Sequence, residues 1–337
     1  MSPLGSSAGR IPARRQVMGL GHRVCGGSLV ESPESMVVSG KLPDVVVLAS
    51  RLGSAPFDGF LPAWEHGRPM KSARDIGIIQ VQNVYSGPEA RLWELIMGEQ
   101  VHMGGLSSSM DLAKQAGIGA GMAGVDLCCC SGAGMRFLVR FCQVAQMRGV
   151  DATAAMVELG QKRCAQEGLS RQISFTLAEA SATGLPAGGF DFVWGEDAWC
   201  YVPDKPKLIA EAVRLVKPGG LIAFTDWVEG PASLAEAEAD WLMHFMNFPS
   251  FASVTDYTTL LSASGCKVLA ARDTGRFAPC VDLYCDMINK QLTYDALKIV
   301  GFDAAVLEEV GKGMGRMQTL AHAGSLVQGL FVARKGD

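Results

Sequence analysis

The sequence predicts an α/β fold built on a seven-stranded, mostly parallel sheet, and two observations lead to it. From residue 124 onward, short apolar runs alternate with amphipathic stretches of helical length, which is typical of repeated strand–helix units. A glycine-rich turn, Gly132-Ala133-Gly134, follows the first strand, at the end of a parallel sheet where ligands bind. The predicted strands are 124–127, 147–150, 173–177, 190–194, 221–225, 267–271 and 326–333.

Helices are expected between these strands and ahead of the first one. They have apolar residues three and four apart, and the last of them runs into the turn Lys217-Pro218-Gly219-Gly220. Two longer segments, about 231–262 and 273–325, are predicted to be helical inserts that shape a substrate pocket. The predicted helices are 88–97, 107–116, 135–145, 153–167 and 205–216.

Residues 1–70 differ from the domain predicted for 71–337. The first thirty residues contain no Asp or Glu but four arginines, so they resemble an acid-poor organellar transit peptide. A poorly ordered extension, or an upstream reading frame with Met70 as the real start, explains the same composition. We therefore expect a cytoplasmic protein, or an organellar one if this segment is a targeting signal.

Composition excludes several classes of protein. The 337 residues are 48% hydrophobic and 19% charged, with a net charge of −4, so neither disorder nor nucleic-acid binding is expected. The longest apolar run considered, Val45-Val46-Val47-Leu48-Ala49, is far too short for stable membrane insertion. Ten cysteines include three in succession but no CxxC pair, which predicts reduced thiols and no metal site.

The first strand and its turn read Val125-Asp126-Leu127-Cys128-Cys129-Cys130-Ser131-Gly132-Ala133-Gly134. A dinucleotide fingerprint needs a third glycine where this chain has Phe137, so that fingerprint is absent. An acid such as Asp126 would also repel a pyrophosphate, whereas it suits a cationic ligand such as the ammonium of a methionine group.

Acidic residues follow the next strands at matching places. Asp151 ends the second strand, where a carboxylate can accept both ribose hydroxyl protons. Glu179-Ala180 follows the third strand, where an acid can accept from an adenine amine. The fourth strand runs into the acidic and aromatic segment Trp194-Gly195-Glu196-Asp197-Ala198-Trp199. Together these sites fit S-adenosylmethionine (SAM).

On these motifs, residues 75–337 resemble a Rossmann-like class I SAM-dependent methyltransferase. Stretches such as Gly98-Glu99-Gln100-Val101-His102-Met103-Gly104 and Val202-Pro203-Asp204-Lys205 resemble the sarcosine/dimethylglycine branch and its small-amine relatives. The resemblance implies that SAM is held by Asp126, Cys128, Cys130, Gly132, Gly134, Asp151, Ala152, Met156, Glu179 and Ala180.

Cys128 and Cys130 replace two glycines of the family's motif. If either residue needs a positive φ, its Cβ costs about 1–2 kcal/mol, whereas ordinary dihedrals would leave the site intact. A degenerate protein that binds SAM without activity is therefore an alternative.

The resemblance also implies which residues act on the methyl acceptor. We expect His102, Asp197 and Trp199 to be catalytic, with Tyr85, Tyr201, Trp227 and His244 as further pocket candidates. The predicted acceptor is a small amine, and the alternatives are C-, O- or S-methylation of a lipophilic molecule or a thiol. Arsenite methyltransferases resemble the chain around Val202-Pro203-Asp204-Lys205, but Asp197 stands where they carry a metalloid-binding cysteine.

Overall fold

The computed structural model describes residues 70–337. The predicted extension lies outside the described residues except for Met70, so it stays a prediction, as does the choice between a cytoplasmic and an organellar location. Within the described part, no helix is both long and apolar enough to cross a bilayer.

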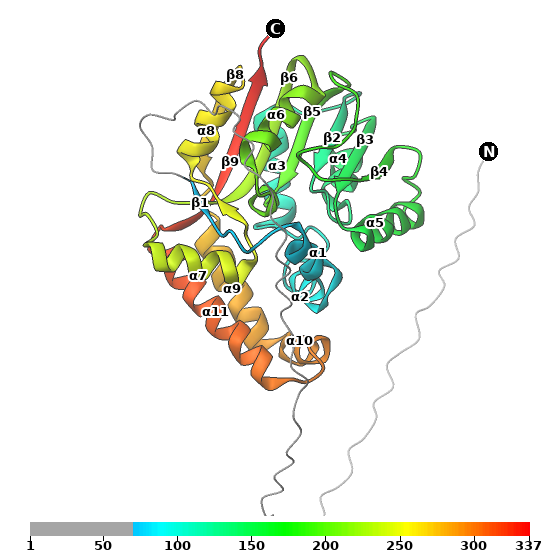
Figure 1. Ribbon diagram of the computed structural model, residues 1–337. Helices are drawn as coiled ribbons and strands as arrows, with labels where there is room; N and C mark the ends of the chain where they lie inside the picture. Colours follow the sequence, from blue (N-terminus) through cyan, green and yellow to red (C-terminus); the bar gives the residue numbers. More distant parts are fainter. Residues whose placement is uncertain (1–69) are drawn as a thin grey trace, which may run out of the picture. The chain divides into compact units, whose positions relative to one another are not determined.

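The seven-stranded, mostly parallel sheet is confirmed (Figure 1). Its strand order is β4-β3-β2-β5-β6-β9-β8, and only β9 runs antiparallel to its neighbours β6 and β8. All seven predicted strands are found, each within a few residues of its expected bounds. The strands are β2 (Ala123–Leu127), β3 (Gln146–Asp151), β4 (Ile173–Leu177), β5 (Phe190–Glu196), β6 (Val216–Glu229), β8 (Cys266–Asp273) and β9 (Leu326–Lys335).

The predicted turn at 217–220 is wrong as a separate element, because β6 begins at Val216 and runs through it. Its register against β5 breaks there: Phe190 pairs with Val216, but Phe192 pairs with Leu221. The extra residues bulge out of the ladder, and Gly219 at φ 69° permits the bend.

Helices cover both faces of the sheet, as predicted. On one face, α3, α4 and α5 cover a core that includes Phe192 and Trp194; on the other, α6 and α8 cover a core around Phe224 and Tyr257. Helix α4 ends four residues before its predicted end. These helices are α3 (Gly105–Ala116), α4 (Ala133–Phe141), α5 (Ala154–Gln166), α6 (Lys205–Leu215) and α8 (Val254–Ala263).

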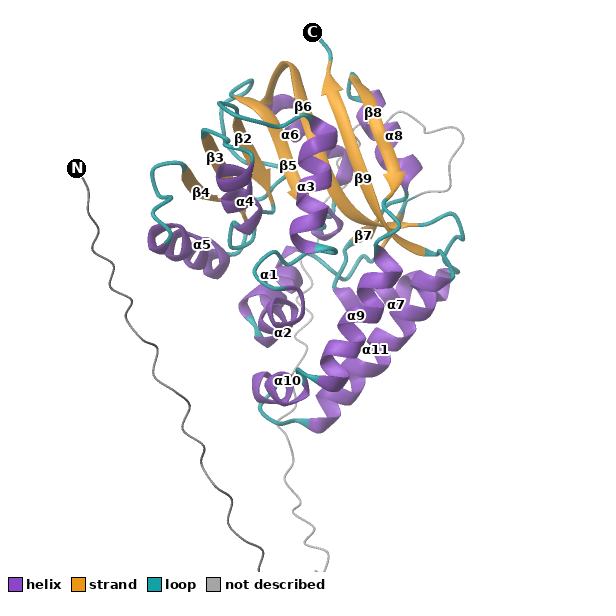
Figure 2. Ribbon diagram, turned by 180° about the vertical axis from the view of Figure 1, so that it is seen from behind, coloured by secondary structure: helices purple, strands orange, loops and turns teal. Residues whose placement is uncertain are grey.

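A second group of helices lies beyond the carboxyl ends of the parallel strands (Figures 1 and 2). It contains helices from both predicted inserts, together with α1, which was not predicted because its β-branched residues are equally typical of a strand. The short strands β1 (Lys71–Ser72) and β7 (Ser250–Phe251) pair with each other. They hold the segment ahead of α1 against the segment that follows α7. Its helices are α1 (Ile78–Ser86), α2 (Pro88–Met97), α7 (Glu236–Met246), α9 (Phe277–Lys290), α10 (Thr293–Ile299) and α11 (Ala304–His322), and a 3₁₀ turn, η1 (Trp199–Tyr201), follows β5.

Candidate active site

A cavity that opens to solvent lies at the carboxyl ends of the parallel strands. Its floor is formed by the residues that follow β2, β3, β4 and β5, and α1 and the segment 99–102 complete its wall. Because parallel strands end at one edge, this is where the chain brings the predicted cofactor residues together.

Cys128 and Cys130 adopt the left-handed backbone, with φ of 64° and 48°. Of the two alternatives that the sequence left open, the structure shows the one with positive φ, so each residue costs about 1–2 kcal/mol in backbone strain. Both side chains line the cavity. Burial raises the pKa of the Cys130 thiol to about 12 and that of Cys128 well above its usual value, so both are neutral thiols near pH 7.

The two glycines of the turn have different roles. Gly132 begins α4 at φ 75°, and a Cβ there would lie 2.8 Å from Phe175 Cζ, so it is needed for the bend and for helix–sheet packing. It does not line the cavity. Gly134 does, and a Cβ on it would lie 2.5 Å from Glu196 Oε2 and 3.5 Å from Asp126 Oδ2. The absence of a side chain on Gly134 therefore lets the Glu196 carboxylate lie directly against the turn.

Asp151 is fixed by the backbone around it. Its Oδ2 accepts from the Cys130 amide and its Oδ1 from the Thr153 amide, each at 2.8 Å. Each oxygen keeps lone pairs for another donor, such as a ribose hydroxyl. Burial raises the pKa of the Asp151 carboxyl above its usual value, while these amides oppose that shift.

The remaining cofactor candidates divide between two spaces. Ala152, Glu179 and Ala180 line the cavity. Met156 does not: its sulfur lies 3.4 Å from Cys130 Sγ in a neighbouring groove between α2 and α5. A ligand confined to the cavity would not touch Met156. The predicted contact of Met156 with the cofactor therefore requires a ligand that extends past Cys130 into this groove.

His102 lies inside the wall of the cavity and is only 4% exposed. Its Nε2 is 3.1 Å from Ser109 Oγ and 3.3 Å from Glu196 Oε1. Ser109, on α3, donates to the same Glu196 oxygen at 2.6 Å and accepts from Gln100 at 3.1 Å. Residues from three separate segments thus form one polar cluster beside Gly134.

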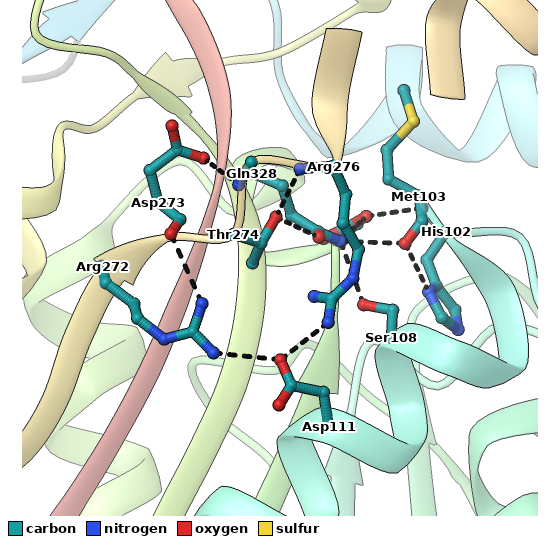
Figure 3. A network of polar contacts seen from close by, with 11 residues as sticks. His102, Met103, Ser108, Asp111, Arg272, Asp273, Thr274, Arg276 and Gln328 are labelled. Carbon is teal, nitrogen blue, oxygen red and sulfur yellow. Dashed lines mark hydrogen bonds and ion pairs between the residues drawn. The ribbon is translucent and has the colours of Figure 1, made fainter. Parts of the chain in front are cut away.

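Asp197 also lines the cavity, but its carboxylate is engaged by the protein. It accepts from the Met103 amide at 2.7 Å and from Gln328 Nε2 at 2.8 Å. Gln328, fully buried on β9, also donates to the Met103 carbonyl, and Figure 3 shows this contact within a network that reaches α9. The geometry makes Asp197 an anchor for the segment that carries His102.

Trp199 corrects the sequence prediction most clearly. It is fully buried and does not line the cavity; its ring stacks on Phe224 with centroids 3.9 Å apart. A residue with no access to a ligand cannot be catalytic in this arrangement, so we assign Trp199 to the core.

Among the other aromatic and histidine candidates, Tyr85 and Tyr201 line the cavity, edge to face at 5.3 Å. Trp227 packs in the helical core, and His244 pairs with Asp75 on the surface.

Two polar residues of the site, Ser109 and Gln328, were given no role in it by the sequence, and Glu196 was named only as part of the acidic segment after the fourth strand. Ser109 is one of three consecutive serines in a helix, and Gln328 lies within an apolar strand, so neither forms a motif. The signal that could have found them is burial, since polar side chains inside a core need partners.

Comparison with known proteins agrees with this architecture. Residues 125–224 match the family model described as "Methyltransferase domain". This segment runs from within β2 to within β6 and so includes the glycine-rich turn after β2. Its strands belong to the Rossmann-like sheet. Residues 125–224 are therefore similar to a methyltransferase domain, and the sheet around them has the Rossmann-like fold of class I methyltransferases.

Individual relatives are distant and chemically diverse. The chain is similar to tocopherol O-methyltransferase of Arabidopsis thaliana, with 27% identity over 58% of this chain and 64% of that protein, so it spans less than two thirds of this relative. A Galdieria sulphuraria structure, provisionally described as a sarcosine dimethylglycine methyltransferase, shares the fold at a TM-score of 0.60, with 20% identity over 69% of this chain and 86% of that one. Phosphoethanolamine N-methyltransferase 2 of Haemonchus contortus, in complex with SAM, does so at 0.65, with 18% identity over 74% and 57%.

The residues present fit the cofactor of this class. SAM carries a sulfonium and an ammonium, and the cavity is lined by the acidic residues Asp126, Asp151 and Glu196. The Asp126 carboxylate is buried, lines the cavity and makes no hydrogen bond with any residue of 70–337, so it has unused capacity for a cation. When bound, SAM supplies an electrophilic methyl group, and the protein's part is to orient it in a dry pocket.

Proposed function

We propose that the chain binds SAM in this cavity and transfers its methyl group to a small amine. The observation that carries the proposal is the charge of the wall. Six of the lining residues are Asp or Glu, and only Glu99 among them forms an ion pair with an arginine, Arg136, whereas no Lys or Arg is among the described residues that line the cavity. The six are Glu99, Asp126, Asp151, Glu179, Glu196 and Asp197.

Such a wall attracts cationic ligands and repels anions. A small amine enters as an ammonium ion and must lose a proton before its lone pair can attack. His102 lines the cavity next to Glu196, which places a proton acceptor of suitable type at the wall. The protein's further contribution is orientation, which can lower a barrier by up to about 7–11 kcal/mol.

A second candidate is O-methylation of a lipophilic phenol. Its support is the part of the wall formed by α1 and the segment after η1, where Ile78, Val81 and Val202 are apolar and Tyr85 and Tyr201 present aromatic rings. The similarity to tocopherol O-methyltransferase favours the same alternative. On this reading His102 would act as general base towards the phenol.

Transfer of a labelled methyl group from SAM tests both candidates in one assay. Glycine, sarcosine, dimethylglycine and phosphoethanolamine represent the amines, and a tocopherol-like phenol represents the lipophilic acceptors. Labelling of any of the four amines supports the proposal, whereas labelling of the phenol alone replaces it with the second candidate. No SAM binding in an equilibrium titration up to millimolar concentrations would refute both.

A further inference from the structure

We infer that the preferred methyl acceptor is an amine without a carboxylate or phosphate group, which enters the cavity as a simple cation. The inference rests on the proposed function and narrows its acceptor class from small amines in general to those whose remaining part is uncharged. It is carried by the cations beside the cavity, the excess of acids in it and the apolar part of its wall.

Three cationic side chains contact wall residues from outside the cavity, and the protein itself engages all three. Arg136 donates to the Ser131 carbonyl at 2.7 Å, and Arg163 donates to the Ser131 hydroxyl at 3.0 Å. Each of these arginines also pairs with a glutamate. Lys205 is fully buried and donates to the Val202 carbonyl at 2.7 Å. None of the three lines the cavity, so they offer no counter-charge to an acceptor's acidic group.

The acids of the wall remain in excess when the cofactor is bound. Five of the six lining acids have no ion pair with an arginine, whereas SAM carries one net positive charge. Burial raises the pKa of the Asp126 carboxyl well above its usual value, yet even without this acid four acids remain. A carboxylate or phosphate brought into the same cavity would therefore meet like charges.

The apolar part of the wall also disfavours an anion. Ile78 and Val81 on α1 and Val202 after η1 give no hydrogen bonds from their side chains, so an acidic group against them would lose its hydration without a partner. Tyr85 and Tyr201 stand edge to face at 5.3 Å. Their hydroxyls are neutral donors that do not offset the acids, while their rings attract an alkylated ammonium group.

The transfer itself keeps one positive charge in the cavity. The deprotonated amine nitrogen forms a bond to the methyl carbon as the carbon–sulfur bond of SAM breaks, and the sulfur keeps the electron pair. The charge of the sulfonium thus passes to the nitrogen of the product. An acidic wall suits both the cation that enters and the cation that forms.

Transfer of a labelled methyl group from SAM to matched pairs of amines tests the inference. The pairs are sarcosine and N-methylethanolamine, dimethylglycine and N,N-dimethylethanolamine, and phosphoethanolamine and ethanolamine. In each pair we expect kcat/KM to be at least about tenfold higher for the amine without the acidic group, mainly through a lower KM. Raising the salt concentration from about 0.02 to about 0.5 M should reduce this preference, because salt screens the charges.

A cation added to the wall should shift the preference. Ile78 lines the cavity and is only partly buried, so Ile78→Arg places a guanidinium at the wall. We expect it to lower the preference for the uncharged amines at least about fivefold, through a lower KM for the anionic ones. Ile79→Arg is the matched control, because it adds the same charge one residue later on α1, where the side chain is 65% exposed and does not line the cavity. It should leave the preference within about twofold of the wild type.

Equal or higher kcat/KM for the anionic members of the pairs would overturn the inference while the proposed function stands. Equal changes of preference in Ile78→Arg and Ile79→Arg would do the same. Absence of transfer to all six amines would instead refute the proposed function, and the inference with it. Should Ile78→Arg fail to fold by circular dichroism, a wild-type preference that salt leaves unchanged would overturn the inference.

Discussion

Replacing both Cys128 and Cys130 by glycine should stabilise the protein, although it removes two partly buried side chains. Both residues have positive φ, which costs an L-residue about 1–2 kcal/mol. Glycine removes this strain, but its greater freedom in the unfolded chain lowers the stability by about 0.5–1 kcal/mol. We therefore expect a net gain of about 0.5–1 kcal/mol per site, and a rise in Tm of about 2–4 °C for the double variant.

Cys129 supplies the matched control, because it lies between the two strained residues but has no positive φ. Its side chain is 6% exposed, and Sγ lies 2.6 Å from the point where a Cβ on Gly149 would stand. Cys129→Gly loses this packing, and the glycine also raises the entropy of the unfolded chain. Both effects favour unfolding, so the variant should be destabilised by about 2 kcal/mol. The two kinds of substitution thus have opposite predicted signs.

Differential scanning calorimetry measures both effects, and a third variant separates their causes. Changing Cys128 and Cys130 to alanine removes the thiols but keeps a Cβ at positive φ, so it should leave Tm within about 1 °C of the wild type or below it. If the double alanine variant is as stable as the double glycine variant, backbone strain is not the cause of any gain and the reasoning fails.

Three further outcomes are expected. Gly134→Ala should raise the Kd for S-adenosylhomocysteine at least fivefold in calorimetry, because its Cβ would lie 2.5 Å from Glu196 Oε2 and displace the carboxylate that Ser109 holds. Asp197→Ala should lower the free energy of unfolding in urea by about 3 kcal/mol, since it leaves the Met103 amide and the Gln328 amide group without their acceptor. Asp226 on β6 is fully buried and accepts a hydrogen bond from the Tyr257 hydroxyl at 2.6 Å. Burial raises the pKa of its carboxyl to about 6 in the folded protein, so the unfolded state binds fewer protons between pH 4 and 6 and stability falls as pH rises. Relative to Asp226→Asn, the wild type should lose up to about 3 kcal/mol across that range in urea titrations, and parallel curves would contradict this.

The sheet was predictable from the sequence because its evidence is local. Each strand of a doubly covered parallel sheet is a short apolar run bounded by turn residues, and each such run was found. Where propensity conflicts with context, the prediction failed. The β-branched residues of α1 are typical of a strand, and the glycines at 219 and 220 suggested a turn that is a bulge inside β6.

The site was predictable where its residues lie at the ends of neighbouring parallel strands. Asp126 lies on β2, Gly134 in the turn after it and Asp151 at the end of β3, and the topology alone brings them to one cavity. Trp199 was misjudged because its place beside an acidic loop says nothing about which way its ring turns, and the ring packs into the core. Gln328 and Ser109 lie far from the motif along the chain, and only the folded structure shows that they hold it.

The cysteines of the turn do not by themselves argue for a degenerate site. The turn after β2 has to adopt a left-handed backbone conformation and point a backbone amide at Asp151, the last residue of β3. The chain keeps both features. Cys128 and Cys130 adopt the left-handed conformation, and the Cys130 amide donates to Asp151 at 2.8 Å. What changes is the space beside the turn, since two neutral thiols now line the cavity. The substitutions therefore cost folding stability first, and they reduce cofactor affinity only so far as the Sγ atoms occupy volume that the ligand needs.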